Sequence, residues 1–302
     1  MEKESSFGHG DLYTRVTNLI IEAMEAGVGE YRMPWHRRSN GLPQNATTKL
    51  PYHGVNTVAL WATSQLRGYM SPFWATYRQW NAHGAQVRKG EKSSSIVFFK
   101  RETDQSSSED EGQDATRQRI VVRGSYVFNA EQVDGWQEAE VSLEDKTERL
   151  ETVEGFVNAL GAEIRYGGDM AAYSSYFDRI HMPERRRFVG TESSTATEAF
   201  YSVLLHEHIH WTGHKRRLAR DLSGRFGERA YAMEELIAEL GSAFLCAELG
   251  ISLQPRRDHA VYVRSWLSAL REQKSAIVRT SGMAMTACRY MGELAAKKER
   301  AA

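Results

Sequence analysis

Two histidines and a glutamate in the segment His206-Glu207-His208-Ile209-His210 have the types and spacing of a metal-dependent catalytic site. On a helix, side chains four residues apart lie on one face, with about 5–6 Å between their Cβ atoms. His206 and His210 can therefore bind one metal ion through neutral imidazole rings. Glu207 projects about a quarter of a turn away, where its carboxylate can accept a proton from a water at the metal. The motif predicts two metal ligands and a general base.

The third metal ligand must come from outside this motif. In one class of zincin metallopeptidases it is a histidine, in the pattern H-E-x-x-H-x-x-G-x-x-H. Gly213 matches the glycine of that pattern, but Arg216 occupies the position of the last histidine, which disfavours this class. We expect His214 to lie close to the metal ligands, where it can contact substrate or end the helix.

A second zincin class takes a glutamate from a following helix, which we predict over residues 231–249. Glu234, Glu235 and Glu239 compete for this role. Glu235 and Glu239 share one helix face, because they are four residues apart. That face also carries small residues that allow two helices to approach closely: Ala232, Ser242 and Cys246. We predict Glu235 as the ligand and Glu239 as the residue that orients His206 through its other ring nitrogen. A solvated acidic helix face is the alternative.

The hydrophobic pattern predicts an α+β fold of two domains. We expect helices over 11–26, 55–66 and 73–83, then strands over 95–99 and 120–128 that form a small antiparallel sheet. An acidic run at about 103–116 is expected to be a disordered loop between these strands. The predicted boundaries are 1–133 for the first domain, 134–150 for a linker and 151–302 for the second domain.

The second domain is expected to begin with a helix over 152–160 and short strands over 163–166, 172–176 and 179–182. A short strand beside a metal site can pair with an extended peptide substrate. The helix of the metal motif follows, with Ser194 and Thr197 as candidate caps. Helices over 262–270 and 281–296 are predicted to close the domain.

Composition and charge restrict the class of protein further. No apolar run is long enough to cross a membrane, and the N-terminus lacks the apolar core of a signal peptide. The two cysteines, Cys246 and Cys288, are expected to be reduced core residues of a cytoplasmic protein. Residues 1–101 contain 13 Lys and Arg against 7 Asp and Glu, whereas residues 102–160 contain 5 against 15. A basic first third favours a polyanionic partner, with an ordinary surface excess as the alternative.

Ordered motifs in both domains resemble those of one known family. In the first domain they are Pro34-Trp35, Asn45-x-x-Thr48, Tyr52-x-Gly54-x-Asn56, Trp74-x-Thr76-x-x-Gln79, Val87-Arg-Lys-Gly-Glu-Lys92 and Val127-Phe-Asn-Ala-Glu-Gln132. In the second domain they are His206-Glu-His-Ile-His210-x-Thr-Gly-His214 and Glu234-Glu-Leu-Ile-Ala-Glu-Leu-Gly241. The chain resembles the ArdC-type antirestriction proteins of conjugative plasmids over nearly its whole length.

This resemblance implies a first domain that binds single-stranded DNA and a second domain with a zincin-like metalloprotease fold. The second domain is similar to Spartan-type proteases, which act on DNA-bound proteins. The resemblance also implies His206 and His210 as metal ligands, Glu207 as base and a third carboxylate near Glu235. We expect Zn²⁺, with Mn²⁺ or Co²⁺ as alternatives for two histidines and a carboxylate.

Exposed basic and aromatic side chains are the natural contacts for single-stranded DNA. We predict phosphate contacts from Arg37, Lys89 and Lys92. Trp35, Tyr52 and Trp74 are candidate stacking partners for bases, and Asn56 completes the predicted DNA-binding set. The alternative for each aromatic residue is a place in the core.

Two functions from different classes follow from these observations. In the first, the protein is a DNA-activated metalloprotease that cleaves a DNA-bound protein or a restriction enzyme. In the second, it coats incoming single strands and blocks restriction, and its metal site is structural or vestigial. Glu207 favours the first function, because a structural metal site does not need a general base.

Overall fold

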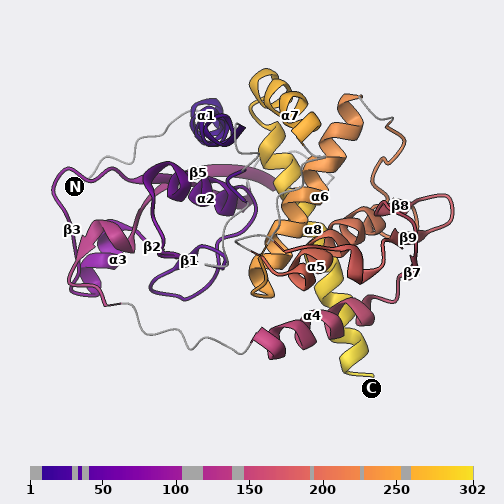
Figure 1. The fold of residues 1–302 in the computed structure, drawn as a ribbon. Helices are drawn as coiled ribbons and strands as arrows, with labels where there is room; N and C mark the ends of the chain where they lie inside the picture. The colour runs from indigo at the N-terminus through magenta and orange to yellow at the C-terminus, as the bar shows by residue number, and fades with distance from the viewer. Residues whose placement is uncertain are drawn as a thin grey trace, which may run out of the picture.

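The computed structural model describes residues 9–28, 33–35, 41–103, 118–137, 146–190, 194–224, 228–252 and 260–301. The fold is α+β, with an N-terminal unit at the left of Figure 1 and a larger, mainly helical unit at the right. Within these described ranges, no helix has the length and apolar character needed to span a membrane. Arg37, most of the acidic loop at 103–116 and part of the linker at 134–150 lie outside the described residues.

The N-terminal unit packs two helices against a small sheet. The helices are α1 (His9–Gly27) and α2 (Val55–Arg67), which contact each other and strand β4. The sheet has the order β1 (Gln44–Asn45), β2 (Phe73–Ala75), β5 (Gln118–Asn129) and β4 (Ser94–Thr103). Its β1–β2 pair is parallel and its other pairs are antiparallel.

The helix predicted over 73–83 is wrong in its first half. Residues Phe73–Ala75 form β2, which is buried and pairs with strands on both sides, and only Tyr77–Ala82 form helix α3. Thr76 explains the boundary, because it forms a capping box with Gln79: the Gln79 N–H donates to Thr76 Oγ1 at 3.2 Å. A short ribbon of β3 (Gln86–Val87) and β6 (Val133–Asp134) follows, with the 3₁₀ turn η2 (Ala130–Gln132) before β6.

In its described residues, the C-terminal unit combines a three-stranded sheet with five α-helices, one of which carries the metal motif. The sheet has the order β7 (Glu163–Tyr166), β9 (Arg179–Met182) and β8 (Ala172–Ser174). The remaining elements are α4 (Lys146–Leu160), η3 (Arg185–Arg187), α5 (Ala196–Thr212), α6 (Arg229–Glu248), α7 (Ala260–Glu272) and α8 (Ala276–Glu299). Helix α5 packs against the sheet and against α6 (Figure 1).

Helices α5 and α6 approach each other closely at one glycine. A Cβ atom on Gly241 would lie 2.7 Å from Ile209 Cδ1, so a larger residue there would force the Ile209 side chain or the helices to move. Nearby, the Ser242 hydroxyl donates to the carbonyl of Ser202 at 2.9 Å. Helix α5 begins after Thr195, which forms a capping box with Glu198, so neither predicted cap is the one used.

The largest hydrophobic core contains residues from both units. The rings of Trp61 in α2 and Phe244 in α6 are 5.8 Å apart, and those of Trp35 and Trp266 are 6.3 Å apart. The Thr17 hydroxyl of α1 donates to the Lys274 carbonyl at 2.6 Å. The N-terminal helices therefore pack on the same core that supports the metal motif.

Candidate metal centre

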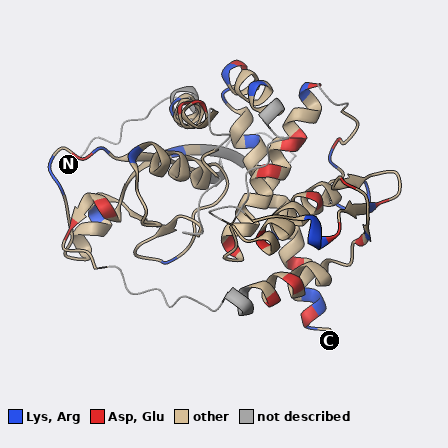
Figure 2. Cartoon of the chain, in the orientation of Figure 1, with Lys and Arg blue, Asp and Glu red and all other residues tan. Residues whose placement is uncertain are grey.

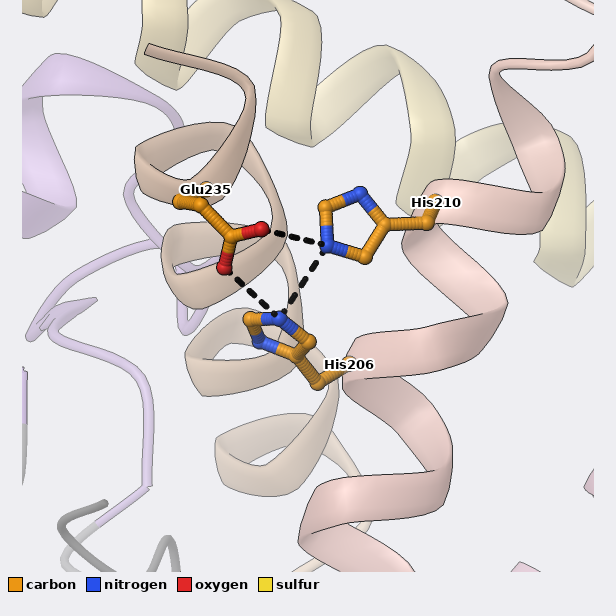
Figure 3. Close-up of side chains that lie close together, drawn as sticks. All are labelled: His206, His210 and Glu235. Atoms are coloured by element: carbon orange, nitrogen blue, oxygen red, sulfur yellow. Dashed lines mark hydrogen bonds and ion pairs between the residues drawn. The ribbon is translucent and has the colours of Figure 1, made fainter. Parts of the chain in front are cut away.

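His206, His210 and Glu235 converge on one point between α5 and α6 (Figure 3). The two Nε2 atoms are 3.2 Å apart. The Glu235 carboxylate lies 3.5 Å from His206 Nε2 through one oxygen and 3.6 Å from His210 Nε2 through the other. Helix α5 provides both histidines from one face, and α6 provides Glu235 because Gly241 allows the helices to approach.

These separations suit a divalent cation. Ligand atoms around a tetrahedral zinc ion at about 2.0–2.1 Å lie about 3.3 Å from one another. Two imidazoles and one carboxylate are also the protein ligands of catalytic zinc sites, which leave a fourth position for water or substrate. The donor atoms present therefore fit a catalytic metal better than a closed structural site.

His210 is oriented by Glu234, one of the three glutamates considered as third ligand, and by Arg220, which the sequence did not indicate. Its Nδ1 atom lies 3.2 Å from Glu234 Oε1, and Arg220 donates two hydrogen bonds to the same carboxylate at 2.7 and 3.0 Å. Arg220 also donates to Ile209 O at 2.6 Å and to Thr212 Oγ1 at 2.8 Å. A carboxylate on the second nitrogen fixes the tautomer and direction of a ligand imidazole. Arg220 lies in a loop, where no periodic pattern marks it.

Glu239 lies next to His206, on the same face of α6 as Glu235. Its Oε2 atom is 3.6 Å from His206 Nδ1, and both side chains are buried. This separation exceeds the usual 2.7–3.2 Å of a hydrogen bond. The predicted solvated acidic face is not observed, because Glu234, Glu235 and Glu239 are all buried.

His214 has partners of a different kind. Its Nδ1 atom accepts a hydrogen bond from the Arg216 N–H at 3.3 Å and lies 3.6 Å from Asp178 Oδ2. Asp178 also accepts a hydrogen bond from Arg217 at 3.1 Å. This partly buried cluster connects the turn between β8 and β9 to the chain that follows α5.

Two further residues define the interior of the site. Glu207 is buried directly beside His206 in α5. His208 is fully buried, its Nδ1 donates to the Leu204 carbonyl at 2.8 Å, and burial lowers its pKa to about 4. It is a neutral core residue between the two candidate ligands.

Tyr231, at the start of α6, also borders the site and was not foreseen from the sequence. Burial raises the pKa of its phenol, and the Glu235 charge and hydrogen bonds with Tyr262 and Glu235 raise it further. The phenol therefore keeps its proton and can donate it in a hydrogen bond to the carboxylate of Glu235.

The aromatic residues predicted to stack on DNA bases are buried in the protein instead. Trp35 and Trp74 are only 2% and 1% exposed, so their rings cannot offer a face to a base. Tyr52 is also buried and accepts a hydrogen bond from Asn45 Nδ2 at 3.1 Å. The Asn56 amide exchanges two hydrogen bonds with the backbone of Val97, at 2.7 and 2.8 Å. These motif residues stabilise the N-terminal unit, and their predicted stacking is corrected accordingly.

The basic residues of the predicted DNA-binding set differ from the aromatic ones. Lys89 and Lys92 are exposed on the turn that follows β3. Arg37 lies outside the described residues. The exposed lysines therefore remain the structurally accessible part of the predicted set.

The fold and the metal motif together define a zincin-like metallopeptidase domain, and the family model of that description matches residues 151–283. A model of the N-terminal domain of anti-restriction factor ArdC matches residues 10–128. The metal-free crystal structure of ArdC from plasmid R388 has a TM-score of 0.75 and 38% identity, and the match covers 95% of this chain and 98% of that one. Its Mn(II)-bound structure has a TM-score of 0.73 and 35% identity, with coverage of 96% and 99%. The chain belongs to the ArdC family of antirestriction proteins.

Two curated relatives extend this comparison. Protein y4eC of Sinorhizobium fredii is 44% identical over 287 residues, which cover 93% of this chain and 91% of that protein. DNA primase TraC of Escherichia coli is 37% identical over 285 residues, which cover 89% of this chain and 26% of the primase. The chain thus corresponds to about a quarter of this primase.

Proposed function

We propose that this antirestriction protein is a metal-dependent peptidase that acts on protein substrates while it is bound to single-stranded DNA. The observation that carries this proposal is the convergence of His206, His210 and Glu235 beside the buried Glu207. We assign DNA binding to residues 1–133 and hydrolysis to residues 151–302, joined by a linker over 134–150. The expected substrate is a DNA-bound protein or a restriction enzyme in the cytoplasm.

The chemistry follows from the residues of the site. A divalent cation held by His206, His210 and Glu235 would supply Lewis-acid chemistry that polarises a water and the peptide carbonyl. The Glu207 carboxylate accepts a proton from the attacking water and delivers it to the nitrogen of the leaving amine. Arg220 and Glu234 keep His210 in one tautomer. We propose Zn²⁺ as the cation, with Mn²⁺, as in the R388 relative, or Co²⁺ as alternatives.

Charge supports the DNA-binding part of the proposal. Residues 41–98 contain one acidic residue, Glu91, and six basic residues: Lys49, Arg67, Arg78, Arg88, Lys89 and Lys92. Blue positions on the turn beside β3, at the left edge of Figure 2, belong to this basic segment. Phosphate contacts by such residues supply most of the affinity in sequence-independent binding.

The Glu207→Gln variant tests the proposed hydrolysis. We expect the variant to keep the metal content and DNA affinity of the parent protein and to lose cleavage of an unfolded protein substrate in the presence of single-stranded DNA. Removing a general base typically lowers the rate about 10²–10⁴-fold. Glu184→Gln, an exposed carboxylate in the same unit, is the matched control and should leave cleavage unchanged.

The alternative function has a different signature in the same variant. A protective DNA-binding protein with a structural metal site would show no metal-dependent cleavage in the parent. It would also protect incoming plasmid DNA in a restricting recipient equally well with Glu207→Gln. That pair of results would contradict the peptidase proposal.

A further inference from the structure

The N-terminal unit contains a cavity of about 670 Å³ on a part of the fold that the metal centre does not use. It lies between α3, the end of β5 and the ribbon of β3 and β6. Its aromatic lining is Tyr77 and Phe128, and its polar lining is Gln86, Arg88, Lys89, Glu91 and Asp134. An open cavity with aromatic rings, hydrogen-bonding groups and a lysine at its edge is suited to a planar, polar ligand with a negative charge.

The cavity is held in shape by its own hydrogen bonds. Gln86 Nε2 donates to the Tyr77 hydroxyl at 3.1 Å and to the Val87 carbonyl at 3.0 Å. Gln86 and Asp134 face each other as partners in the β3–β6 ribbon. Arg88 supports the rim, because it donates to Glu91 Oε1 at 3.0 Å and lies 3.6 Å from Asp134 Oδ1. The phenol of Tyr77 is thus kept in place although the residue is 48% exposed.

Two of the polar side chains that line the cavity, Gln86 and Asp134, offer acceptors opposite each other in the β3–β6 ribbon. Both amide hydrogens of Gln86 are engaged, which leaves its Oε1 atom to accept. The carboxylate of Asp134 can only accept when it is ionised. Cytosine, adenine and guanine carry exocyclic amino groups with two hydrogens that can donate to two such acceptors, whereas thymine has no amino group and offers a single N3–H between two carbonyl oxygens. The exposed Lys89 is placed to contact a neighbouring phosphate.

We infer that this cavity binds one base of single-stranded DNA and prefers bases with an exocyclic amino group over thymine. The base stacks on Tyr77, donates its amino hydrogens to Gln86 Oε1 and the Asp134 carboxylate, and leaves its phosphate near Lys89. This inference rests on the single-stranded DNA binding proposed above, and it adds a site, a base preference and one further contact residue, Asp134 of β6.

Fluorescence anisotropy with oligo-dC and oligo-dT of equal length, about 12 nucleotides, tests the inference. The parent protein should bind oligo-dC more tightly than oligo-dT. Tyr77→Ala should weaken oligo-dC binding about ten-fold, because it removes the stacking surface. Tyr166→Ala, an exposed tyrosine in β7 of the other unit, is the matched control and should change the affinity less than two-fold, a margin of about 0.4 kcal/mol.

Asp134→Ala removes both acceptor oxygens and tests the base preference separately, and its readout is the ratio of the two affinities. Loss of a negative charge raises the affinity for both oligonucleotides, but only the preference for oligo-dC depends on the acceptor. We expect this ratio to fall towards one. A parent that binds both oligonucleotides equally, or a Tyr77→Ala variant that binds like the parent, would overturn the inference and leave the proposed DNA binding intact. A parent that binds neither oligonucleotide would overturn both.

Discussion

Arg220 acts on the metal centre through the carboxylate of Glu234. Its guanidinium donates two hydrogen bonds to that carboxylate, which in turn lies 3.2 Å from His210 Nδ1. Gly213 allows this approach, because a Cβ atom there would lie 3.0 Å from Arg220 Nη2. The glycine of the metal motif is therefore needed for close packing at an ordinary backbone conformation, with φ of −72°.

The Arg220→Lys variant tests this arrangement. A lysine retains the positive charge, but it cannot reproduce the planar pair of hydrogen bonds that arginine makes to a carboxylate. We expect metal affinity to fall about 10–100-fold while the helical content stays unchanged. Competition with a metal-binding dye measures the affinity, and Arg229→Lys, from an exposed ion pair with Glu272, provides the control. Equal affinities in the two variants would refute the role of Arg220.

At the scale of elements, the contact between α5 and α6 decides whether a metal site exists. Its closest point is Gly241 against Ile209, one residue before the ligand His210. A wider separation would withdraw Glu235 from both histidines, because the carboxylate comes from α6 and the imidazoles from α5. Stability and metal binding should therefore respond together to changes at this contact.

The Gly241→Ala substitution should destabilise the protein by about 1–3 kcal/mol, the usual range for overpacking a tight core. Urea denaturation measures this change, and we expect metal affinity to fall in parallel. Adding Ile209→Ala removes the Cδ1, Cγ1 and Cγ2 atoms that a new Cβ would meet at 2.7, 2.8 and 3.2 Å and should restore part of the loss of metal affinity. Gly282→Ala in α8, where a Cβ atom meets nothing within 4 Å, should be neutral or stabilising. The same loss at both glycines would contradict the account.

The ion pair between Asp178 and Arg217 lies at the turn between β8 and β9, and its contribution to stability should depend on pH. Burial acts to raise the pKa of Asp178, but hydrogen bonds from Arg217 and Tyr173 outweigh it and hold the pKa below its usual value. An unfolded aspartate has a pKa of about 3.9. The pair therefore stabilises the fold above that pH, and this contribution is lost as the pH falls through the lower folded pKa.

Asp178→Asn should remove this part of the acid sensitivity. Between about pH 5 and pH 3, the free energy of unfolding should fall less steeply in the variant than in the parent. Denaturant titrations at several pH values measure both slopes, and Asp169→Asn, at a more exposed ion pair, is the control. Parallel curves for parent and Asp178→Asn would exclude the contribution.

The sequence predicts an element of this fold correctly when the residues that determine the element are neighbours in the chain. The helices at 11–26 and 55–66 appear within two residues of their predicted ends, because apolar spacing and flanking glycines determine them locally. The helix over 73–83 failed because Phe73–Ala75 pair with β1 and β5, which lie far away in the chain.

The same distinction applies to the site. Helical spacing alone brings His206 and His210 to one face of α5, whereas Glu235 was selected by its helix face together with the small residues that allow α6 to approach. The base stacking predicted for Trp35 and Trp74 is not observed. An aromatic residue in a sequence motif can be a buried core residue or an exposed stacking surface, and the motif alone does not distinguish them. Arg220 and Tyr231 could not be predicted, because only the packed structure brings their side chains to the metal ligands.

At the scale of the whole molecule, one hydrophobic core joins the N-terminal unit to the C-terminal unit. Residues of α1 and α2 pack with those of α6, α7 and α8, so the basic N-terminal unit and the metal centre belong to one packed body. A protein substrate near bound DNA would therefore meet the site at a defined position.

Salt dependence measures the electrostatic part of DNA binding at this scale. Each phosphate contact to a single strand contributes about 0.7 to the slope of log affinity against log salt concentration. We expect a steep decrease in the parent, and the double variant Lys89→Ala/Lys92→Ala should reduce the slope by about 1.4. An affinity that stays flat from low to high salt would refute phosphate contacts by these lysines.

Metal content per chain tests the central claim most directly. Elemental analysis after dialysis should find one divalent metal per chain in the parent and in Glu239→Gln, and none in Glu235→Gln. That result would establish that the two histidines of α5 and the carboxylate of α6 form one binding site. A parent without metal, or a Glu235→Gln variant that retains it, would contradict the account.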